Sequence, residues 1–501
     1  MKFLIRFMLM FALILTMNFN VQAQESAPTL AIEEIIVTAR KKEESIQDVP
    51  MAVTAITDQL NEGSVRRIED IQAFAPNLFI NRTPGIASGA AITIRGVASL
   101  ESDKSYEPSI GVVMDGMFLG TSSGVLLDNF DIERIEVLRG PQGTLFGKNT
   151  TGGILNVIRT PVSLTDLGVD ASLTIGEFGR QDLKTVIQVP IIEDKLGVKI
   201  FAASIEHDGH VYNTFLEKDS GGDDKLNYGF TTLWEPNDQF SLKFHYEIME
   251  DKSEQGSYVN RNRVGELACT ITQIGFDPRN GCEINANDGP NTVESDGSNF
   301  SDNEYESMIV TANYDTENFL YTYIYSNRDM DEQNMQDFDG SPARLLRMNF
   351  FNDWEQTSHE FRVTSQFSDK FQFIAGIYDW EADFAQRWNV YDLFYQLSRL
   401  GVPPWPFGRK GVAGYDDVDV WEDDVAGNNG QTQVTESIAV FASVDWFVTD
   451  QLTVTAGFRW TEEEKDFVGG ASAPGYYPLR GEPWPGIYNP TSYSAKWDET
   501  T

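Results

Sequence analysis

From residue 166 onward, apolar and polar residues alternate one by one along the chain. In the segment 240–248 every even residue is apolar or aromatic and every odd residue is polar, and 452–460 repeats the pattern with one glycine. Similar rows occupy 319–325 and 438–448. A period of two places each kind of side chain on its own face of a β-strand. The sequence therefore predicts a large β-structure with one apolar and one polar face.

The connections between these strands alternate between short and long. Short turns are expected within 190–197, 235–239, 315–318, 368–370 and 449–451, and long connections within 207–225, 251–303, 329–353 and 383–431. A transmembrane β-barrel has this asymmetry, because tight turns lie at one rim and long loops at the other. A soluble β-sandwich is the alternative, but it gives no reason for this order of loop lengths. We expect an antiparallel transmembrane barrel.

Charge and residue types exclude several functions. The 501 residues include 38 Lys and Arg against 76 Asp and Glu, a net charge of −38. A chain this acidic repels phosphate backbones, so nucleic acid is not an expected partner. With two Cys and four His, a metal site built on these residues is not expected either, and no cofactor is predicted.

The first 23 residues are typical of a secretory signal peptide. Lys2 and Arg6 provide the positive start, and the apolar stretch 7–17 is too short to span a bilayer. Small residues at Val21 and Ala23 predict cleavage after Ala23, and a short hydrophobic anchor is the alternative.

Export to an oxidising compartment allows the two cysteines to be joined. Cys269 and Cys282 are separated by twelve residues in a stretch rich in Asn, Asp and Gly. We predict a disulfide that pins an exposed loop.

Residues 51–165 have a different pattern, with β-branched runs between short helical segments. Strands are expected at 51–57, 92–95, 110–114, 132–138 and 154–158, and an amphipathic helix at 68–74 that ends before Pro76. The predicted organisation is a signal peptide (1–23), a polar segment (24–50), a small α/β domain (51–165) and a barrel part (166–501).

Five segments in this order resemble the TonB-dependent outer-membrane receptors of Gram-negative bacteria: 33–39, 48–50, 94–96, 135–147 and 152–158. The resemblance implies a plug domain, here 51–165, folded inside a 22-stranded barrel. About twelve strands are expected by residue 501. The sequence is therefore expected to be truncated about midway through the barrel.

The resemblance also implies a TonB box, the segment that the energy-transmitting protein TonB binds. The matching residues are Ile35, Ile36, Val37, Thr38 and Ala39. An extended β-branched segment in a polar stretch is suited to pair with a partner's sheet edge. The alternative is that 35–37 is the first strand of the plug.

Arg95 and Arg139 match plug arginines that, in the family, pair with glutamates of the barrel wall and lock the plug. Those glutamates are expected beyond Thr501. The alternative is a local pair of Arg139 with Glu136 or Glu133.

Ligand contacts are expected where long loops meet the tips of the plug. On the plug we expect Arg82, Tyr106 and Phe118 to face the ligand. In the aromatic and acidic segment 388–424 we expect Trp388, Trp405 and Trp421 to do so. Aromatic faces stack on sugars or flat chelates. The acidic residues offer oxygen ligands for Ca²⁺ but lack the EF-hand pattern, and a solvated acidic loop is the alternative.

The resemblance implies an integral protein of the outer membrane that contacts its lipid and actively imports a scarce extracellular ligand with TonB. A ferric siderophore is the default cargo, and a saccharide is the alternative. A signal-transducing receptor and a passive porin are further alternatives. No catalytic motif for hydrolysis is found, so an enzyme is not expected.

Overall fold

In the computed structural model, the described residues are 35–61, 65–83, 89–98, 103–125, 130–259, 291–297, 299–342, 346–365, 368, 370–391, 428–472 and 493–500. The signal peptide (1–23), Cys269, Cys282, Trp405 and Trp421 lie outside these residues, and the predictions made for them stay predictions. The part of the chain from Ile36 to Thr501 forms one compact unit.

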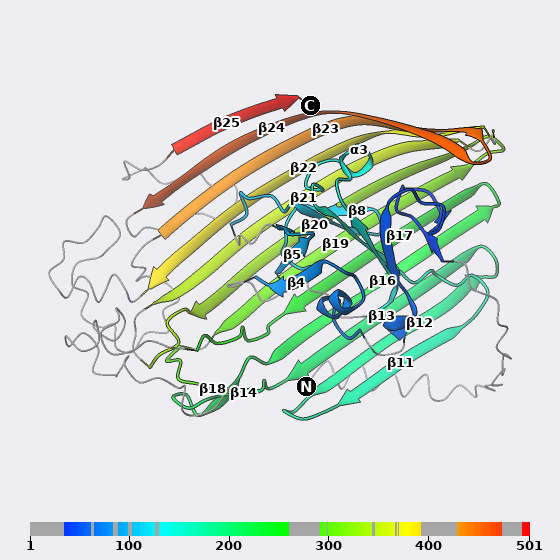
Figure 1. The fold of residues 1–501 in the computed structure, drawn as a ribbon. Helices are drawn as coiled ribbons and strands as arrows, with labels where there is room; N and C mark the ends of the chain where they lie inside the picture. Colours follow the sequence, from blue (N-terminus) through cyan, green and yellow to red (C-terminus); the bar gives the residue numbers. More distant parts are fainter. Residues whose placement is uncertain are drawn as a thin grey trace. The chain divides into compact units, whose positions relative to one another are not determined.

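In the N-terminal domain, residues 36–159, the described residues form short strands and three short helices (Figure 1). Its elements are β1 (Ile36–Val37), β2 (Glu44–Ser45), β3 (Ala52–Ile56), α2 (Asp58–Asn61), η1 (Ile68–Ala73), β4 (Leu78–Arg82), β5 (Ala90–Ile94), β6 (Val97–Ala98), β7 (Ile110–Met114), β8 (Met117–Leu119), β9 (Ile132–Arg139), α3 (Gly143–Phe146) and β10 (Gly153–Arg159). The five strands expected here are present, with bounds shifted by up to two residues.

Three sheets organise this domain. The central sheet has the order β3-β9-β10-β7-β8, in which β10 runs parallel to β7 and the other neighbours are antiparallel. A second sheet joins β4, β5 and β6, and β1 pairs with β2 alone. The helix expected at 68–74 is a 3-10 helix, whose start is held by the Asp70 carboxylate as it accepts from the Arg66 and Arg67 N–H groups.

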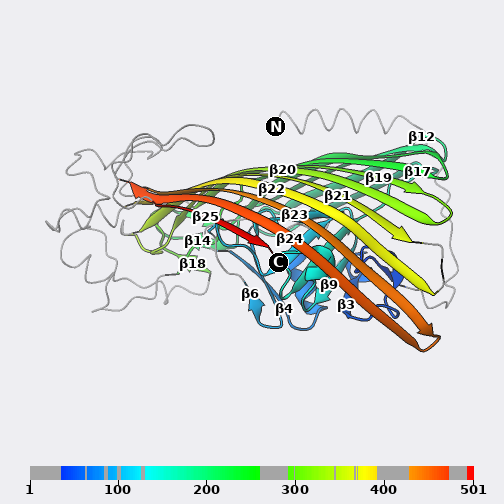
Figure 2. The same cartoon turned by 90° about the horizontal axis from the view of Figure 1, so that it is seen from above.

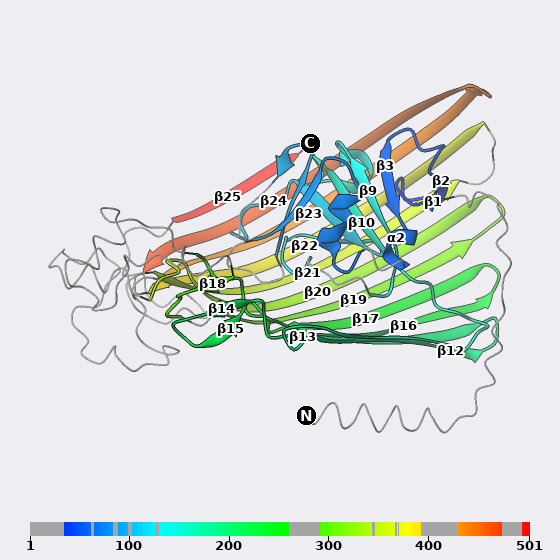
Figure 3. The same ribbon diagram turned by 60° about the horizontal axis from the view of Figure 1, so that its bottom comes forward.

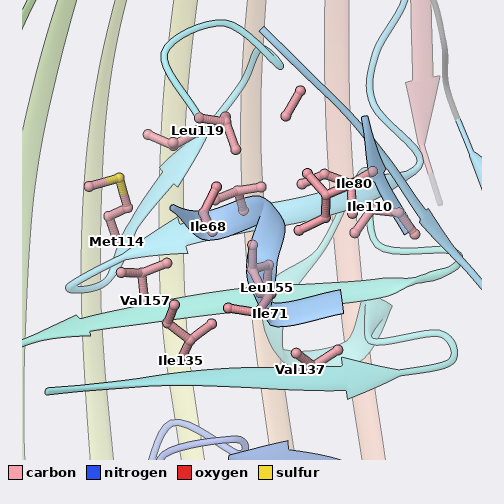
Figure 4. Packing of buried hydrophobic residues seen from close by; sticks show 14 of the residues in the cluster. Ile68, Ile71, Ile80, Ile110, Met114, Leu119, Ile135, Val137, Leu155 and Val157 are labelled. Atoms are coloured by element: carbon pink, nitrogen blue, oxygen red, sulfur yellow. The ribbon is translucent and has the colours of Figure 1, made fainter. Parts of the chain in front are cut away.

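The core of the domain lies between η1 and the central sheet. Figure 4 shows Ile68 and Ile71 of η1 directed toward Leu155 of β10, with Ile135 and Val137 of β9 beside them. The spacing of three residues between Ile68 and Ile71 places both on the buried side of the helix, as the sequence predicted.

From residue 168 onward, the described residues form one large antiparallel sheet of 12 strands (Figure 1). In spatial order the strands are β11 (Gly168–Ile175), β12 (Gln181–Ile192), β13 (Leu196–His207), β16 (Asp223–Asn237), β17 (Phe240–Asp251), β19 (Phe300–Asp315), β20 (Phe319–Asp337), β21 (Arg347–Ser365), β22 (Phe371–Tyr391), β23 (Asn428–Thr449), β24 (Leu452–Ser472) and β25 (Tyr493–Thr500). This confirms the predicted succession of antiparallel hairpins.

The two faces of the large sheet have opposite polarity. On β17 the polar residues His245, Glu247 and Asp251 are buried. On β23 the apolar residues Val440 and Val444 are exposed. Figure 2 shows the N-terminal domain on one side of the large sheet. The ion pairs described below show that this is the side of the buried polar residues. The large sheet thus has an apolar outer face and a polar inner face.

Two expectations about the connections were wrong. The β11–β12 hairpin is closed by only five residues, 176–180, so short and long connections do not alternate strictly at the first hairpin. The long connection expected at 329–353 is shorter, because β20 continues to Asp337 and β21 begins at Arg347. In 327–337 the only apolar residues are Met330 and Met335, five positions apart, so the period of two disappears from the sequence although the backbone ladder continues.

A small sheet joins the long connections at one end of the large sheet. It has the order β15-β14-β18, with β14 (Val211–Asn213), β15 (Lys218–Ser220) and β18 (Thr292–Val293) (Figure 3). The expectation of plain loops at 207–225 and 251–303 therefore missed three short strands. Among the described helices, none has the length and apolar character needed to cross a membrane.

We predict that Leu155→Ala lowers the free energy of unfolding of the N-terminal domain by about 2–5 kcal/mol, because Leu155 is fully buried in the core. Phe79→Ala is the matched control, since Phe79 is exposed and its removal leaves no cavity. Denaturant unfolding of the full chain measures both, and equal losses would contradict this view of the core.

Candidate functional site

Residues 36–39 of the predicted TonB box (35–39), called the box segment below, are half docked. Val37 is 0% exposed and Ala39 is buried beside it, whereas Ile36 remains 40% exposed. Val37 and Ala39 pack in a cluster with Phe118, Leu138 and other apolar residues of the domain. β1 pairs only with β2, through Ile36 opposite Ser45, and is not a strand of the central sheet.

A buried carboxylate holds the end of this segment. Glu136 of β9 is 0% exposed. Its Oε1 accepts from the Thr38 backbone N–H at 2.7 Å and from Arg134 Nε at 2.9 Å, and its Oε2 accepts from Asn156 Nδ2 at 3.1 Å. From the sequence, Glu136 was considered only as a partner of Arg139. The available signal was its place between Ile135 and the apolar pair Val137 and Leu138, because a buried charge needs several donors.

Three basic residues directly after the segment bind the wall of the large sheet. Arg40 Nη1 donates to Asp445 Oδ2 at 2.9 Å, and Lys42 Nζ lies 3.0 Å from the same oxygen. Lys41 Nζ lies 2.5 Å from Glu360 Oε2. Burial lowers the pKa of Lys41 even though Glu360 opposes this effect. Directly after the box segment, the side chains of the N-terminal domain are thus bound to strands β21 and β23.

A second group of ion pairs joins the domain to strands β13 and β17. Arg159 at the end of β10 pairs with Glu247 of β17, and its Nη1 lies 3.7 Å from Asp115 Oδ2. Lys199 of β13 lies 2.6 Å from Asp131 Oδ2. Burial by itself raises the pKa of Asp115, but the positive groups around it outweigh burial and bring the pKa to about 2.

Side chains of β20 and β21 hold the tip of the domain. Gln356 of β21 donates from Nε2 to the Phe118 carbonyl at 2.6 Å and accepts from the Gly120 N–H at 3.0 Å. Lys104 Nζ lies 3.2 Å from Glu332 Oε2 of β20 and also donates to Ser123 Oγ. The inner wall therefore contacts the domain through side chains of β13, β17, β20, β21 and β23.

A cavity of about 1180 Å³ lies between the domain and the wall. Thr38 and Lys41 line it on one side together with Asp115, and Asn313 and Thr322 line it from the sheet. Its volume exceeds the usual range of small-molecule sites, roughly 300–1000 Å³. The box segment therefore borders the large cavity between the domain and the sheet.

Arg95 and Arg139 form no ion pair with a carboxylate of the described residues. Arg139 donates to Thr54 Oγ1, and burial together with the positive charge of Arg95 lowers its pKa. Glu133 and Glu136, considered as local partners of Arg139, both accept from Arg134. The predicted lock with the barrel wall stays a prediction.

The residues expected to face a ligand differ from one another in their exposure and in their contacts. Tyr106 is 63% exposed at the tip of the domain. Arg82 lies 3.6 Å from Glu69 and 3.9 Å from Asp223 of the wall, and Trp388 lies half-buried near the end of β22. Phe118 contradicts the expectation, since it is 7% exposed and packs in the cluster that holds Val37. In β8 its ring points into the core, and only its backbone reaches the wall.

These contacts define a class of protein: a small α/β plug held by ion pairs on the polar face of a large antiparallel sheet. Residues 45–154 match the family described as TonB-dependent Receptor Plug Domain. The chain thus carries a plug domain of the TonB-dependent receptors, as the sequence predicted, and we call residues 36–159 the plug from here on.

Known proteins share this arrangement. The chain is 21% identical over 437 residues to the "Pesticin receptor" of Yersinia pestis, covering 86% of this chain and 56% of that protein. It is 21% identical over 480 residues to the "Rhizobactin receptor" of Rhizobium meliloti (strain 1021), covering 90% and 58%. The crystal structure of the ferric yersiniabactin uptake receptor FyuA from Yersinia pestis superimposes with a TM-score of 0.68 at 17% identity, over 90% of this chain and 60% of that one.

These likenesses establish the fold: a plug domain followed by the strands of a receptor barrel. The chain spans just over half the length of the two curated relatives. Its activity, cargo and partners are therefore matters for proposal.

We predict that Asp115 contributes to acid sensitivity. Its folded pKa of about 2 lies below the ordinary value of 3.8, so the carboxylate stabilises the fold above pH 4 and this contribution is lost as the pH falls toward 2. The loss amounts to about 2 kcal/mol. Unfolding free energies measured from pH 5 to pH 2 should fall less steeply in Asp115→Asn than in the parent chain, whereas Asp58→Asn, at an exposed position, should leave the slope unchanged. Equal slopes for Asp115→Asn and the parent would contradict the assignment.

Proposed function

We propose that this chain is part of an energised importer of the bacterial outer membrane that takes up a ferric siderophore with the help of TonB. The observation that carries the proposal is the plug, which fills the polar side of the sheet and carries a half-docked box segment at its start. A plugged sheet does not act as an open pore, so passage requires a movement that the box segment is placed to trigger.

The polarity of the large sheet supports the outer membrane as the location. Val440 and Val444 of β23 and Phe458 of β24 are exposed on the outer face. A strand crosses the apolar part of a bilayer with about 9–11 residues, and β19 to β24 are all longer than this. The outer faces of these strands contact lipid, and the polar continuation of β20 and β21 extends beyond it.

The proposed partner is TonB, which would pair with the box segment as an added strand. Ile36 is accessible while Val37 and Ala39 are buried, so a partner meets the start of the segment first and must undock the rest. Because Arg40 and Lys42 bind Asp445, a pull on the segment reaches the barrel wall and the border of the cavity. No covalent chemistry is involved in this proposal.

The names of the relatives support an iron chelate as cargo. Matched proteins include the "Rhizobactin receptor" and the ferric yersiniabactin uptake receptor FyuA. On this chain, Tyr106 and Arg82 lie at the exposed tip of the plug, where cargo would arrive.

Uptake of radioactive iron tests the proposal. Cells that produce the complete receptor containing this chain should accumulate iron from its chelate, and deletion of TonB or collapse of the membrane potential should abolish the accumulation. Uptake that persists without TonB would contradict the proposal and favour a passive pore. Uptake of a saccharide instead of iron would retain the mechanism and replace the cargo.

We predict that Ile36→Pro lowers the rate of TonB-dependent uptake at least about tenfold, whereas cargo binding stays unchanged. Proline removes the backbone N–H that a paired strand needs and restricts the residue before it. Ile36→Val, which keeps the N–H and the β-branched shape, is the control. Radioactive uptake and equilibrium binding measure the two effects separately. Normal uptake by the proline variant would exclude 35–39 as the TonB box.

We predict that Val444→Lys destabilises the membrane-inserted protein by about 2–4 kcal/mol, because the new charge faces lipid. The neighbouring Ser443 lines the cavity on the inner face, so Ser443→Lys should cost far less. Unfolding of the reconstituted protein in vesicles measures both. A larger loss for Ser443→Lys would mean that the faces have been assigned in reverse.

A further inference from the structure

Glu136 is a buried charged residue whose position is explained neither by surface exposure nor by a role in cargo binding. It lies between Ile135 and Val137 of β9, both of which are buried in the core of the plug. Its carboxylate is also fully buried, and Thr38, Arg134 and Asn156 all donate to it. A charge inside an apolar strand is stable only when several donors surround it.

Two of these donor groups belong to the box segment. The Thr38 backbone N–H donates to Glu136 Oε1 at 2.7 Å, and the Thr38 hydroxyl lies 3.2 Å from the same oxygen. Asn156 Nδ2 lies 3.3 Å from the Thr38 hydroxyl as well. Thr38 is therefore bound at its main chain and its side chain, directly after the two residues of β1.

We propose that Glu136 is the positioning residue that keeps the TonB box docked on the plug, and that loss of its contact with Thr38 is the step that makes the box available. The inference rests on the proposed function, because it deepens the role assigned to residues 35–39. Glu136 acts through Thr38 and touches neither cargo nor TonB.

The remaining donors explain why undocking is feasible. When Thr38 leaves, Glu136 keeps its hydrogen bonds from Arg134 Nε and from Asn156 Nδ2, so the buried charge is not left without partners. Undocking then exposes only two fully buried apolar side chains of the segment, Val37 and Ala39. The docked and undocked states therefore differ by a small number of contacts, among which those to Glu136 are charge-assisted.

A labelling experiment on the full chain tests the inference. Ala39→Cys, combined with Cys269→Ser and Cys282→Ser, places one thiol at a buried position of the box. The rate of maleimide labelling in outer-membrane vesicles reports how often the box undocks. Glu136→Gln weakens the acceptor with little change of shape. Glu133→Gln is the matched control, because Glu133 lies on the same strand and binds Arg134 without contacting Thr38.

We expect Glu136→Gln to raise the labelling rate about ten- to hundredfold, the range for losing hydrogen bonds to a charged acceptor. Glu133→Gln should stay within about twofold of the parent. An unchanged rate in Glu136→Gln would overturn the inference. A rise of equal size in Glu133→Gln would also overturn it, since Arg134 rather than Glu136 would then hold the box.

A second pair of variants tests the contact from the side of the box. Thr38→Val removes the hydroxyl at constant shape and should raise the labelling rate, whereas Thr38→Ser retains the hydroxyl and should restore the parent rate. This pair answers the question even where Glu136→Gln does not fold. Equal rates for Thr38→Val and Thr38→Ser would overturn the inference.

Capture of the purified periplasmic domain of TonB separates this inference from the proposed function. Faster labelling of Glu136→Gln together with stronger TonB capture supports both. Faster labelling with no TonB capture by either chain supports the docking contact and overturns the TonB-box assignment. Unchanged labelling with TonB capture overturns the docking contact alone.

Discussion

Carboxylates on the inner face of the large sheet are buried because the plug supplies their counter-charges. Glu247 faces Arg159, Glu360 faces Lys41, and Glu332 faces Lys104. Each of these pairs joins a strand of the wall to the plug, and removing one member of a buried pair costs about 3–5 kcal/mol. The plug and the wall are therefore folded as one unit, although each has its own hydrogen-bonded sheets.

Such an interface suits the movement of the plug that the proposed function requires. Ion pairs and hydrogen bonds lose little net free energy when water replaces the partner, whereas an apolar interface of the same size would resist separation. The apolar contacts of the plug are instead kept inside it, between η1 and the central sheet. The plug can thus shift against the wall while its own core stays intact.

The sequence predicted those features that depend on local pattern. Alternation gave the antiparallel strands around Phe244 and Val440, and the five strands of the plug were found from their β-branched runs. The pattern failed where the cause is tertiary. β20 extends to Asp337 because the ladder continues above the apolar band, where nothing in the polarity of the sequence marks a strand.

The site residues likewise divide into those that the local pattern predicts and those whose position depends on tertiary contacts. The box segment was proposed from its residues, but its docking on the plug was not predicted, because Glu136 lies 98 positions away from Thr38. Phe118 was expected at the surface because it lies near a tip of the plug, yet the direction of its ring is set by the pairing of β8 with β7. Glu360, Glu247 and Glu332 were not predicted at all, since an inward carboxylate on a strand looks like any other polar residue of the alternation.

The central claim is that the large sheet has a lipid-facing side and a plug-facing side that alternate residue by residue. Fluorophores attached to single cysteines at each position from 438 to 446 of β23, in the reconstituted protein with Cys269 and Cys282 replaced by serine, test it directly with a quencher carried by the lipid. We predict strong quenching at the even positions, which include Val440 and Val444, and weak quenching at the odd positions, which include Phe441 and Asp445. Quenching that is uniform along the strand, or strongest at the odd positions, would contradict the account.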